Sequence, residues 1–159
     1  MRAYQVFAAM EPKHAEGVLA TLAEKAPGVT AQAVAIAAAT MNSRPQYMKK
    51  LTAEKRAAAV RRALARVKAN DMAEEVLAVY FLECRKELLA EWLGVIGLEH
   101  EDGILQDDAP EAPSAKELKA AVEKFQSASD DADRLLLMRA FASQSSIDWP
   151  ELDGLIAGD

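Results

Sequence analysis

Residues 72–93 read MAEEVLAVYFLECRKELLAEWL, and this stretch decides the fold class. It contains the unbroken apolar run Val76 to Leu82, and the spacing of its apolar residues is helical, which predicts one long helix ending at about Leu93. A helix that is apolar on most sides packs among other helices. The stretch therefore predicts the central element of a helical core, with Asp71 as its N-cap.

A second apolar helix is predicted from Ala31 to about Thr40, where almost every residue is Ala, Val or Ile. This composition is typical of a buried helix, so we expect it to lie centrally as well. Thr30 is its expected cap, and Pro45 limits how far it can extend, because the residue before a proline is disfavoured in a helix.

The whole chain is predicted to be all-α, because no stretch shows the sustained alternation that is typical of strands. Capping and proline signals divide it into an irregular bundle of six to eight helices around a mostly apolar central helix. The clearest helix starts are Pro12, in a permitted first turn, Thr52, as an N-cap, and Ser114 with Glu117, as a capping box. The expected helices cover residues 2–10, 12–25, 31–40, 52–70, 72–93 and 115–126, a helix capped by Asp130 or Asp131, and a short turn after Asp148.

The chain is expected to form a single helical domain, residues 1–159. Its loop 99–113 gathers acidic residues, Gly103 and prolines, and divides a main part, residues 1–98, from a smaller acidic helical part, residues 114–159. Compact domains usually connect their elements with about 4 to 6 residues. Either an ordered loop with a function or a linker fits this length.

Composition predicts a soluble, acidic, cytoplasmic protein. The formal net charge is −6 and the hydrophobic fraction is 51%. The single cysteine, Cys84, excludes an intramolecular disulfide and suits a reducing compartment. Residues 1–10 lack the apolar core of a signal peptide, and no apolar run approaches the roughly 20 residues that a membrane span needs.

The best functional clue is a basic run. Between Lys49 and Lys68 the chain has eight basic residues and one acid, Glu54. On the expected helix 52–70, Ala53, Val60, Leu64 and Val67 form an apolar stripe, and Lys55, Arg62 and Arg66 lie opposite.

Two interpretations of this basic helix stay open. Residues 1–98 hold 14 basic and 10 acidic side chains and residues 99–159 hold 5 and 15, so the two parts should attract each other. The helix then lies beside Glu83, Glu87 and Glu91 or beside the acidic C-terminal part, and its charges are solvated or loosely paired. In the alternative, phosphates of a nucleic acid or another polyanion bind to the basic side chains. The candidate contacts are Lys49, Lys50, Lys55, Arg62 and Arg66.

Two further sites are candidates for binding. Arg44 precedes Pro45 and a short helix, so it could help to bind an anion. Trp149, Leu152 and Ile156 are spaced like the anchors of an amphipathic helix that docks on a partner, although a terminal helix more often fills a groove of its own domain.

No catalytic, metal or cofactor site is predicted. His14 and His100 are the only imidazoles, and no glycine-rich phosphate loop occurs. Glu11 and His14 match half of a di-metal motif whose second half is missing. We therefore expect a non-catalytic protein-interaction or structural module that has a protein partner or forms a homo-oligomer. Nucleic-acid binding, and an enzyme or small-ligand site built from distant residues, are the alternatives.

Overall fold

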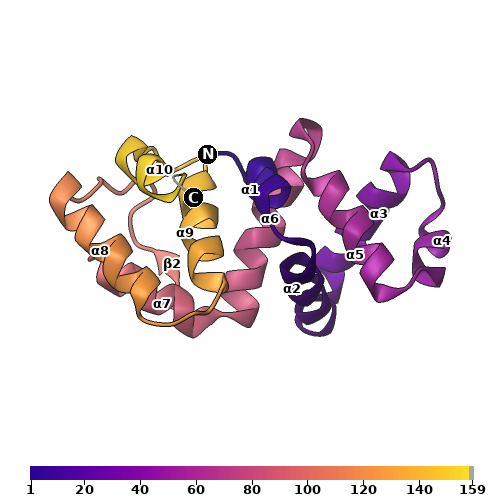
Figure 1. Ribbon diagram of the computed structural model, residues 1–159, viewed down its shortest axis with the longest axis horizontal. Helices are drawn as coiled ribbons and strands as arrows, with labels where there is room; N and C mark the ends of the chain where they lie inside the picture. Colours follow the sequence, from indigo (N-terminus) through magenta and orange to yellow (C-terminus); the bar gives the residue numbers. More distant parts are fainter. Residues whose placement is uncertain (158–159) are drawn as a thin grey trace.

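The structure is a computed structural model that describes residues 1–157, and it confirms that the chain is mostly helical (Figure 1). In these residues the chain forms ten α-helices rather than six to eight. They are α1 (Ala3–Ala9), α2 (Pro12–Lys25), α3 (Pro27–Thr40), α4 (Pro45–Lys50), α5 (Ala53–Leu64), α6 (Asn70–Val79), α7 (Lys86–Val95), α8 (Ala115–Ser127), α9 (Asp133–Ser143) and α10 (Pro150–Ile156). Three short elements complete the chain: a 3₁₀ turn, η1 (Val67–Ala69), a π turn, η2 (Tyr80–Cys84), and a hairpin of β1 (His100–Glu101) and β2 (Ile104–Leu105).

The prediction of one helix over residues 72–93 is wrong. The chain instead forms α6, the π turn and α7, and Arg85 between them leaves the helical conformation at φ −133° and ψ 42°. This break places the guanidinium of Arg85 against acids of the segment before α9, as described below. It also separates Glu83 from Glu87, two like charges that a continuous helix would place one turn apart.

The basic helix is shorter than predicted, because α5 ends at Leu64 rather than near Asn70. Residues 67–69 form η1, and Asn70 is the first residue of α6 instead of a left-handed helix end. The expected apolar stripe therefore holds at Val60 and Leu64, which are buried. It fails at Ala53, which is exposed, and at Val67, whose side chain is 65% exposed. The expected cap is present: the Thr52 hydroxyl accepts a hydrogen bond from the Lys55 amide at 3.2 Å.

The predicted central position of the Ala-rich helix is also wrong. It begins at Pro27, with Thr30 inside it, and it lies at one end of the molecule, where it packs against α2, α5, α4 and α6 (Figure 1). One face is buried through Val29, Ala33 and Ala37, while other alanines are exposed. Alanine has the best intrinsic helix propensity and little apolar surface, so a helix rich in it needs no burial on every side.

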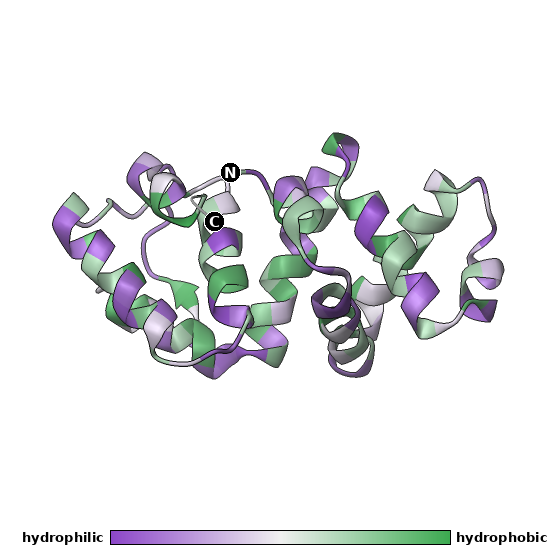
Figure 2. Cartoon of the chain, in the orientation of Figure 1, coloured by the Kyte–Doolittle hydropathy of each residue, from purple (hydrophilic) through white to green (hydrophobic). Residues whose placement is uncertain are grey.

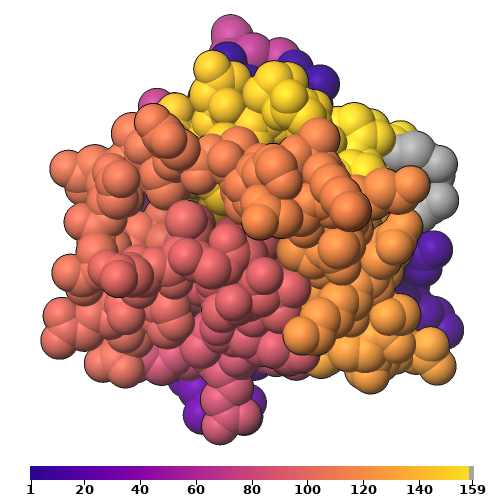
Figure 3. Space-filling model, turned by 90° about the vertical axis from the view of Figure 1, so that its left-hand side faces the viewer, coloured from indigo at the N-terminus to yellow at the C-terminus, as the bar shows by residue number. Residues whose placement is uncertain are grey.

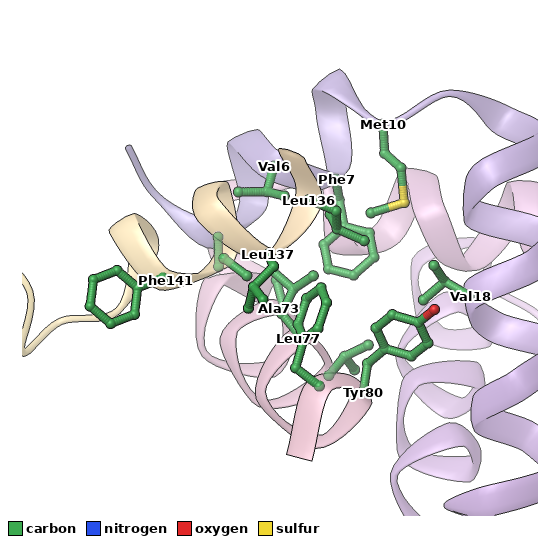
Figure 4. Packing of buried hydrophobic residues seen from close by; sticks show 14 of the residues in the cluster. Val6, Phe7, Met10, Val18, Ala73, Leu77, Tyr80, Leu136, Leu137 and Phe141 are labelled. Atoms are coloured by element: carbon green, nitrogen blue, oxygen red, sulfur yellow. The ribbon is translucent and has the colours of Figure 1, made fainter. Parts of the chain in front are cut away.

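The central element is α6, which lies between α1, α3 and α9. Figure 4 shows the rings of Phe7 and Tyr80 among aliphatic side chains such as Leu77 and Leu136, where α1, α6 and α9 meet. Hydrophobic residues also concentrate where α6, α7 and α9 face one another (Figure 2). An aromatic cluster extends this core, with the Trp92 ring centroid 5.2 Å from that of Phe125 and 5.9 Å from that of Phe141.

The loop 99–113 contains an ordered hairpin that the sequence did not predict. His100 pairs with Leu105 and Glu101 with Ile104, in antiparallel register. The turn between them needs left-handed backbone, with φ of 52° at Asp102 and 87° at Gly103. A Cβ atom built on Gly103 would lie 2.7 Å from Leu89 Cδ2, so the glycine lets the turn rest directly on α7.

The two ends of the molecule carry opposite charge. Residues 1–69 hold 12 basic and 4 acidic side chains, net +8, whereas residues 70–159 hold 7 and 21, net −14. In Figure 1 α3, α4 and α5 form one end, and α7 and α8 form the other. Figure 3 faces this acidic end, where α7, the segment that follows it and α8 form most of the surface. Within residues 1–157, no helix combines the length and the apolar character that crossing a bilayer requires.

Candidate functional site

The basic run folds around α5, where two of its arginines serve the fold. Arg56 donates from Nε to the carbonyl of Met48 at 3.0 Å and from Nη2 to the carbonyl of Leu51 at 2.9 Å. Arg61 donates from Nε to the carbonyl of Met10 at 2.7 Å. These carbonyls lie at the C-terminal ends of α4 and α1, where the last carbonyls of a helix lack partners within it. The two arginines therefore join α5 to its neighbours.

The other six basic side chains of the run are exposed, and we call them the basic edge. They are Lys49, Lys50, Lys55, Arg62, Arg66 and Lys68. Because Arg56 ties the end of α4 to α5, the first three gather near the start of α5, and the last three lie near and beyond its end. The two groups therefore lie toward opposite ends of α5, which has 12 residues and is about 18 Å long.

The expected position of the basic helix, beside Glu83, Glu87 and Glu91 or beside the acidic C-terminal part, is wrong for the part of the chain that the structure describes. Its ion pairs within 4.0 Å involve other residues. Glu91, one of the acids expected near the basic helix, instead binds Arg134, with Nη1 and Nη2 at 3.0 and 3.1 Å from its two oxygens. The reason is tertiary packing, because α5 packs against α1, α2 and α3.

Neighbouring arginines on α5 allow a matched comparison. We expect Arg61→Gln to lower the free energy of unfolding by about 1–2 kcal/mol, because it removes a charged donor from a buried carbonyl. Arg62→Gln should change it by less than about 0.5 kcal/mol, because Arg62 is exposed. Urea denaturation of both variants measures the difference, and equal values would show that Arg61 has no structural role.

The remaining sequence-predicted sites lie elsewhere. Arg44 is exposed and precedes α4, a helix of six residues. Trp149, Leu152 and Ile156 are buried within the chain itself. Trp149 Nε1 donates to the carbonyl of Pro110 at 3.0 Å, and α10 packs on α8 and α9. Tyr47, which the sequence did not single out as a site, is 51% exposed on α4, close in sequence to Lys49.

A second polar feature surrounds the buried Asp133, whose carboxylate accepts hydrogen bonds from α2 and from residues 80–85. His14 Nε2 of α2 lies 2.6 Å from Oδ1. Tyr80 Oη and Arg85 Nη1, from the π turn and the residue after it, donate to Oδ2 at 2.5 Å each. Arg85 Nη2 also donates to Asp131 Oδ2 at 2.7 Å. We call these residues the Asp133 joint.

The electrostatics of the Asp133 joint favour a structural role. Burial alone would raise the pKa of Asp133, but hydrogen bonds from His14 and Tyr80 and the charge of Arg85 outweigh it, so this pKa lies below its ordinary value. Burial, reinforced by Asp133, raises the pKa of Tyr80. An ionised carboxylate with its oxygens occupied and a phenol that resists ionisation are poorly suited to proton transfer near neutral pH.

No local signal in the sequence indicates the Asp133 joint. His14 and Asp133 are 119 positions apart, and Tyr80 and Arg85 lie inside a stretch that predicts an uninterrupted helix. Asp131 was an expected helix cap, but the residue before α9 is Ala132. Only the tertiary fold brings His14, residues 80–85 and residues 131–133 together.

Other candidate chemistry finds little support. His100 Nδ1 accepts a hydrogen bond from the Gly103 amide at 3.1 Å, so His100 helps to close the hairpin. Among residues 1–157, no group of three or more His, Cys, Asp and Glu side chains is arranged to hold a metal ion. Burial raises the pKa of the Cys84 thiol, which disfavours the nucleophilic thiolate.

Comparison with family models, curated proteins and solved structures finds no match for this chain.

Proposed function

We propose that this chain is a non-catalytic interaction module whose basic edge binds a polyanion. The observation that supports this proposal is the exposure of six basic side chains on α5 and on the segments directly before and after it, with no ion pair to any of them in the described part of the chain. Residues 26–69 hold nine basic residues and one acid, so the like charges repel one another. A bound polyanion relieves that repulsion.

The phosphate backbone of a nucleic acid is the polyanion that the basic edge fits best. Contacts to phosphates need only positive groups within reach and no reading of base edges, which suits the exposed lysines and arginines of the basic edge. Exposed Tyr47 adds a ring near Lys49 on which an unpaired base can stack. The acidic far end of the molecule is repelled by the same polyanion, which favours contact through the basic end alone.

The proposal predicts salt-dependent binding that depends on the basic edge. We expect a labelled single-stranded RNA or duplex DNA to bind at low salt, with log K falling linearly against log salt concentration. The variant Lys55→Glu, Arg62→Glu, Arg66→Glu should bind at least about tenfold more weakly, and its slope should be about three smaller in magnitude. Fluorescence anisotropy across a salt series measures both quantities.

The matched control is Lys116→Glu, Lys119→Glu, Lys124→Glu, because these three exposed lysines lie on α8, at the acidic end. It changes the net charge equally and should leave binding nearly unchanged. Equal losses in the two triple variants, or no binding at low salt, would contradict the proposal. If polyglutamate displaced the labelled nucleic acid and unlabelled RNA did not, the partner of the basic edge would be an acidic protein instead. Light scattering at low salt would reveal self-association through the acidic end of a second copy.

A further inference from the structure

A cavity lies beneath the hairpin at the acidic end of the molecule. Its walls come from α6 and the π turn, from α7, from α9 and from the hairpin, and its volume is about 280 Å³. Most of the lining is apolar, from Leu77, Ala78, Phe81, Leu82, Leu89 and Leu93 on one side and Leu137, Ala140 and Phe141 on another. Gly103, Ile104 and Leu105 of the hairpin complete it.

The size of the cavity suits a small organic ligand. An apolar cavity of about 150 Å³ is large enough for benzene, and this cavity has nearly twice that volume. Its volume lies just below the roughly 300 Å³ at which pockets for drug-sized molecules begin, so the ligand must be compact, and like such pockets the cavity is mostly apolar with a few polar groups. On one side the cavity is bounded by the hairpin, whose strands have two residues each. The side chain of Ile104 in this hairpin is 65% exposed. An apolar ligand would cover part of this isoleucine.

The charged side chains that line the cavity are all acidic. They are Glu74, Asp107 and Asp108, and Gln144 and Ser146 are the other polar residues. Glu74 Oε1 accepts hydrogen bonds from the Ser145 amide at 3.2 Å and from its hydroxyl at 3.5 Å, and Asp107 Oδ1 accepts one from the Ala109 amide at 3.0 Å. These bonds hold two of the carboxylates in place without neutralising their charge.

From these observations we infer that the cavity binds a compact apolar molecule with one cationic group, such as an arylalkylamine. Its apolar body fills the space between α6, α7 and α9, and its ammonium group faces the three carboxylates. Burial of apolar surface supplies the affinity, and the charge of the rim supplies selectivity for a cation over an anion. This site is independent of the basic edge, which carries charge of the opposite sign.

Three probes with the same apolar body test this inference: 4-phenylbutylamine, 4-phenylbutanol and 4-phenylbutyrate. Calorimetric titration and ligand-observed NMR of the full chain should show that the amine binds tightest, the alcohol less tightly and the carboxylate at least about tenfold more weakly than the amine. Backbone amide shifts should move around Gly103 and Ala140. Absence of binding by all three probes, or equal binding of all three, would overturn the inference.

Two kinds of variant test the apolar space and the three carboxylates separately. Ala78→Leu and Ala140→Leu fill the cavity and should each weaken the amine by about tenfold or more, whereas Ala31→Leu, on the exposed face of α3, should not. Glu74→Gln, Asp107→Asn, Asp108→Asn leaves the cavity intact and should remove the preference of amine over carboxylate. This second variant remains informative if a filled cavity does not fold. Unchanged binding in both kinds of variant would place the probe elsewhere and overturn the inference.

Discussion

Replacing Asp133 with alanine is expected to lower the free energy of unfolding by about 3–5 kcal/mol, a large fraction of the stability of a small domain. The physical reason is that the Asp133 carboxylate accepts hydrogen bonds from His14, Tyr80 and Arg85, of which Tyr80 is buried. Its removal leaves the Tyr80 hydroxyl and one side of the Arg85 guanidinium without an acceptor. Urea denaturation followed by circular dichroism measures the loss.

A matched control lies three residues earlier, because Asp130 is exposed. Asp130→Ala should cost less than about 0.5 kcal/mol. Asp133→Asn keeps the shape of the side chain and two of its acceptor sites, so it should lose less than Asp133→Ala. If Asp133→Ala were as stable as Asp130→Ala, the Asp133 joint would not stabilise the fold.

The Asp133 joint also predicts how stability depends on pH. The folded pKa of Asp133 lies below the ordinary value of 3.8, so the unfolded chain takes up a proton at a higher pH than the folded chain. The contribution of Asp133 is therefore complete at neutral pH, and it declines as the pH falls below about 4 and through the folded pKa. Denaturation curves at several acidic pH values should show a shallower decline in Asp133→Asn than in the original chain.

The second large effect is expected at Trp92, which has no exposed surface and packs against Phe125 and Phe141. Trp92→Ala should lower the free energy of unfolding by about 3–5 kcal/mol, because it leaves a cavity where α7, α8 and α9 meet. Loss of the cooperative urea transition would also satisfy this prediction. A loss below about 1 kcal/mol would show that the aromatic cluster is poorly packed.

Phenylalanine substitutions at the two tryptophans give a sharper comparison. Trp92 Nε1 is buried without a hydrogen-bond partner in the described residues, whereas Trp149 Nε1 donates to the carbonyl of Pro110. Trp92→Phe removes an unsatisfied donor, which offsets part of its packing loss, and Trp149→Phe leaves a buried carbonyl unpaired. We expect Trp149→Phe to lower the free energy of unfolding more than Trp92→Phe does. The reverse order would show that a difference in packing, and not the hydrogen bond of Trp149, decides which substitution costs more.

Local signals predicted some helix starts correctly and others, at Thr30, Asp71 and Asp131, wrongly. Pro12 opens α2, Thr52 caps α5, and the reciprocal hydrogen bonds of Ser114 and Glu117 form the capping box of α8. Each of these features depends on residues within three positions of one another, so the chain needs no tertiary contact to specify it. The helical class follows from the same kind of signal, since apolar spacing is a local property.

Features that depend on distant contacts escaped prediction. Arg85 interrupts a strongly helical stretch because acids near residue 133 bind its guanidinium, and no neighbour in sequence indicates this. The Ala-rich helix α3 appeared central because its composition is apolar, although its position depends on which partners it packs against. Five residues of the basic edge could be named from the sequence and Lys68 was not among them, while the lack of ion-pair partners within residues 1–157 could not be predicted.

The separation of charge along the molecule makes it an electric dipole. With net +8 in residues 1–69 and net −14 in residues 70–159, an approaching polyanion exerts a torque that turns α5 toward it and the hairpin end away. The torque acts only within a few Debye lengths, each about 8 Å at physiological ionic strength. On the proposed function, a polyanion would therefore be captured in one orientation before contact, with the hairpin end turned away from it.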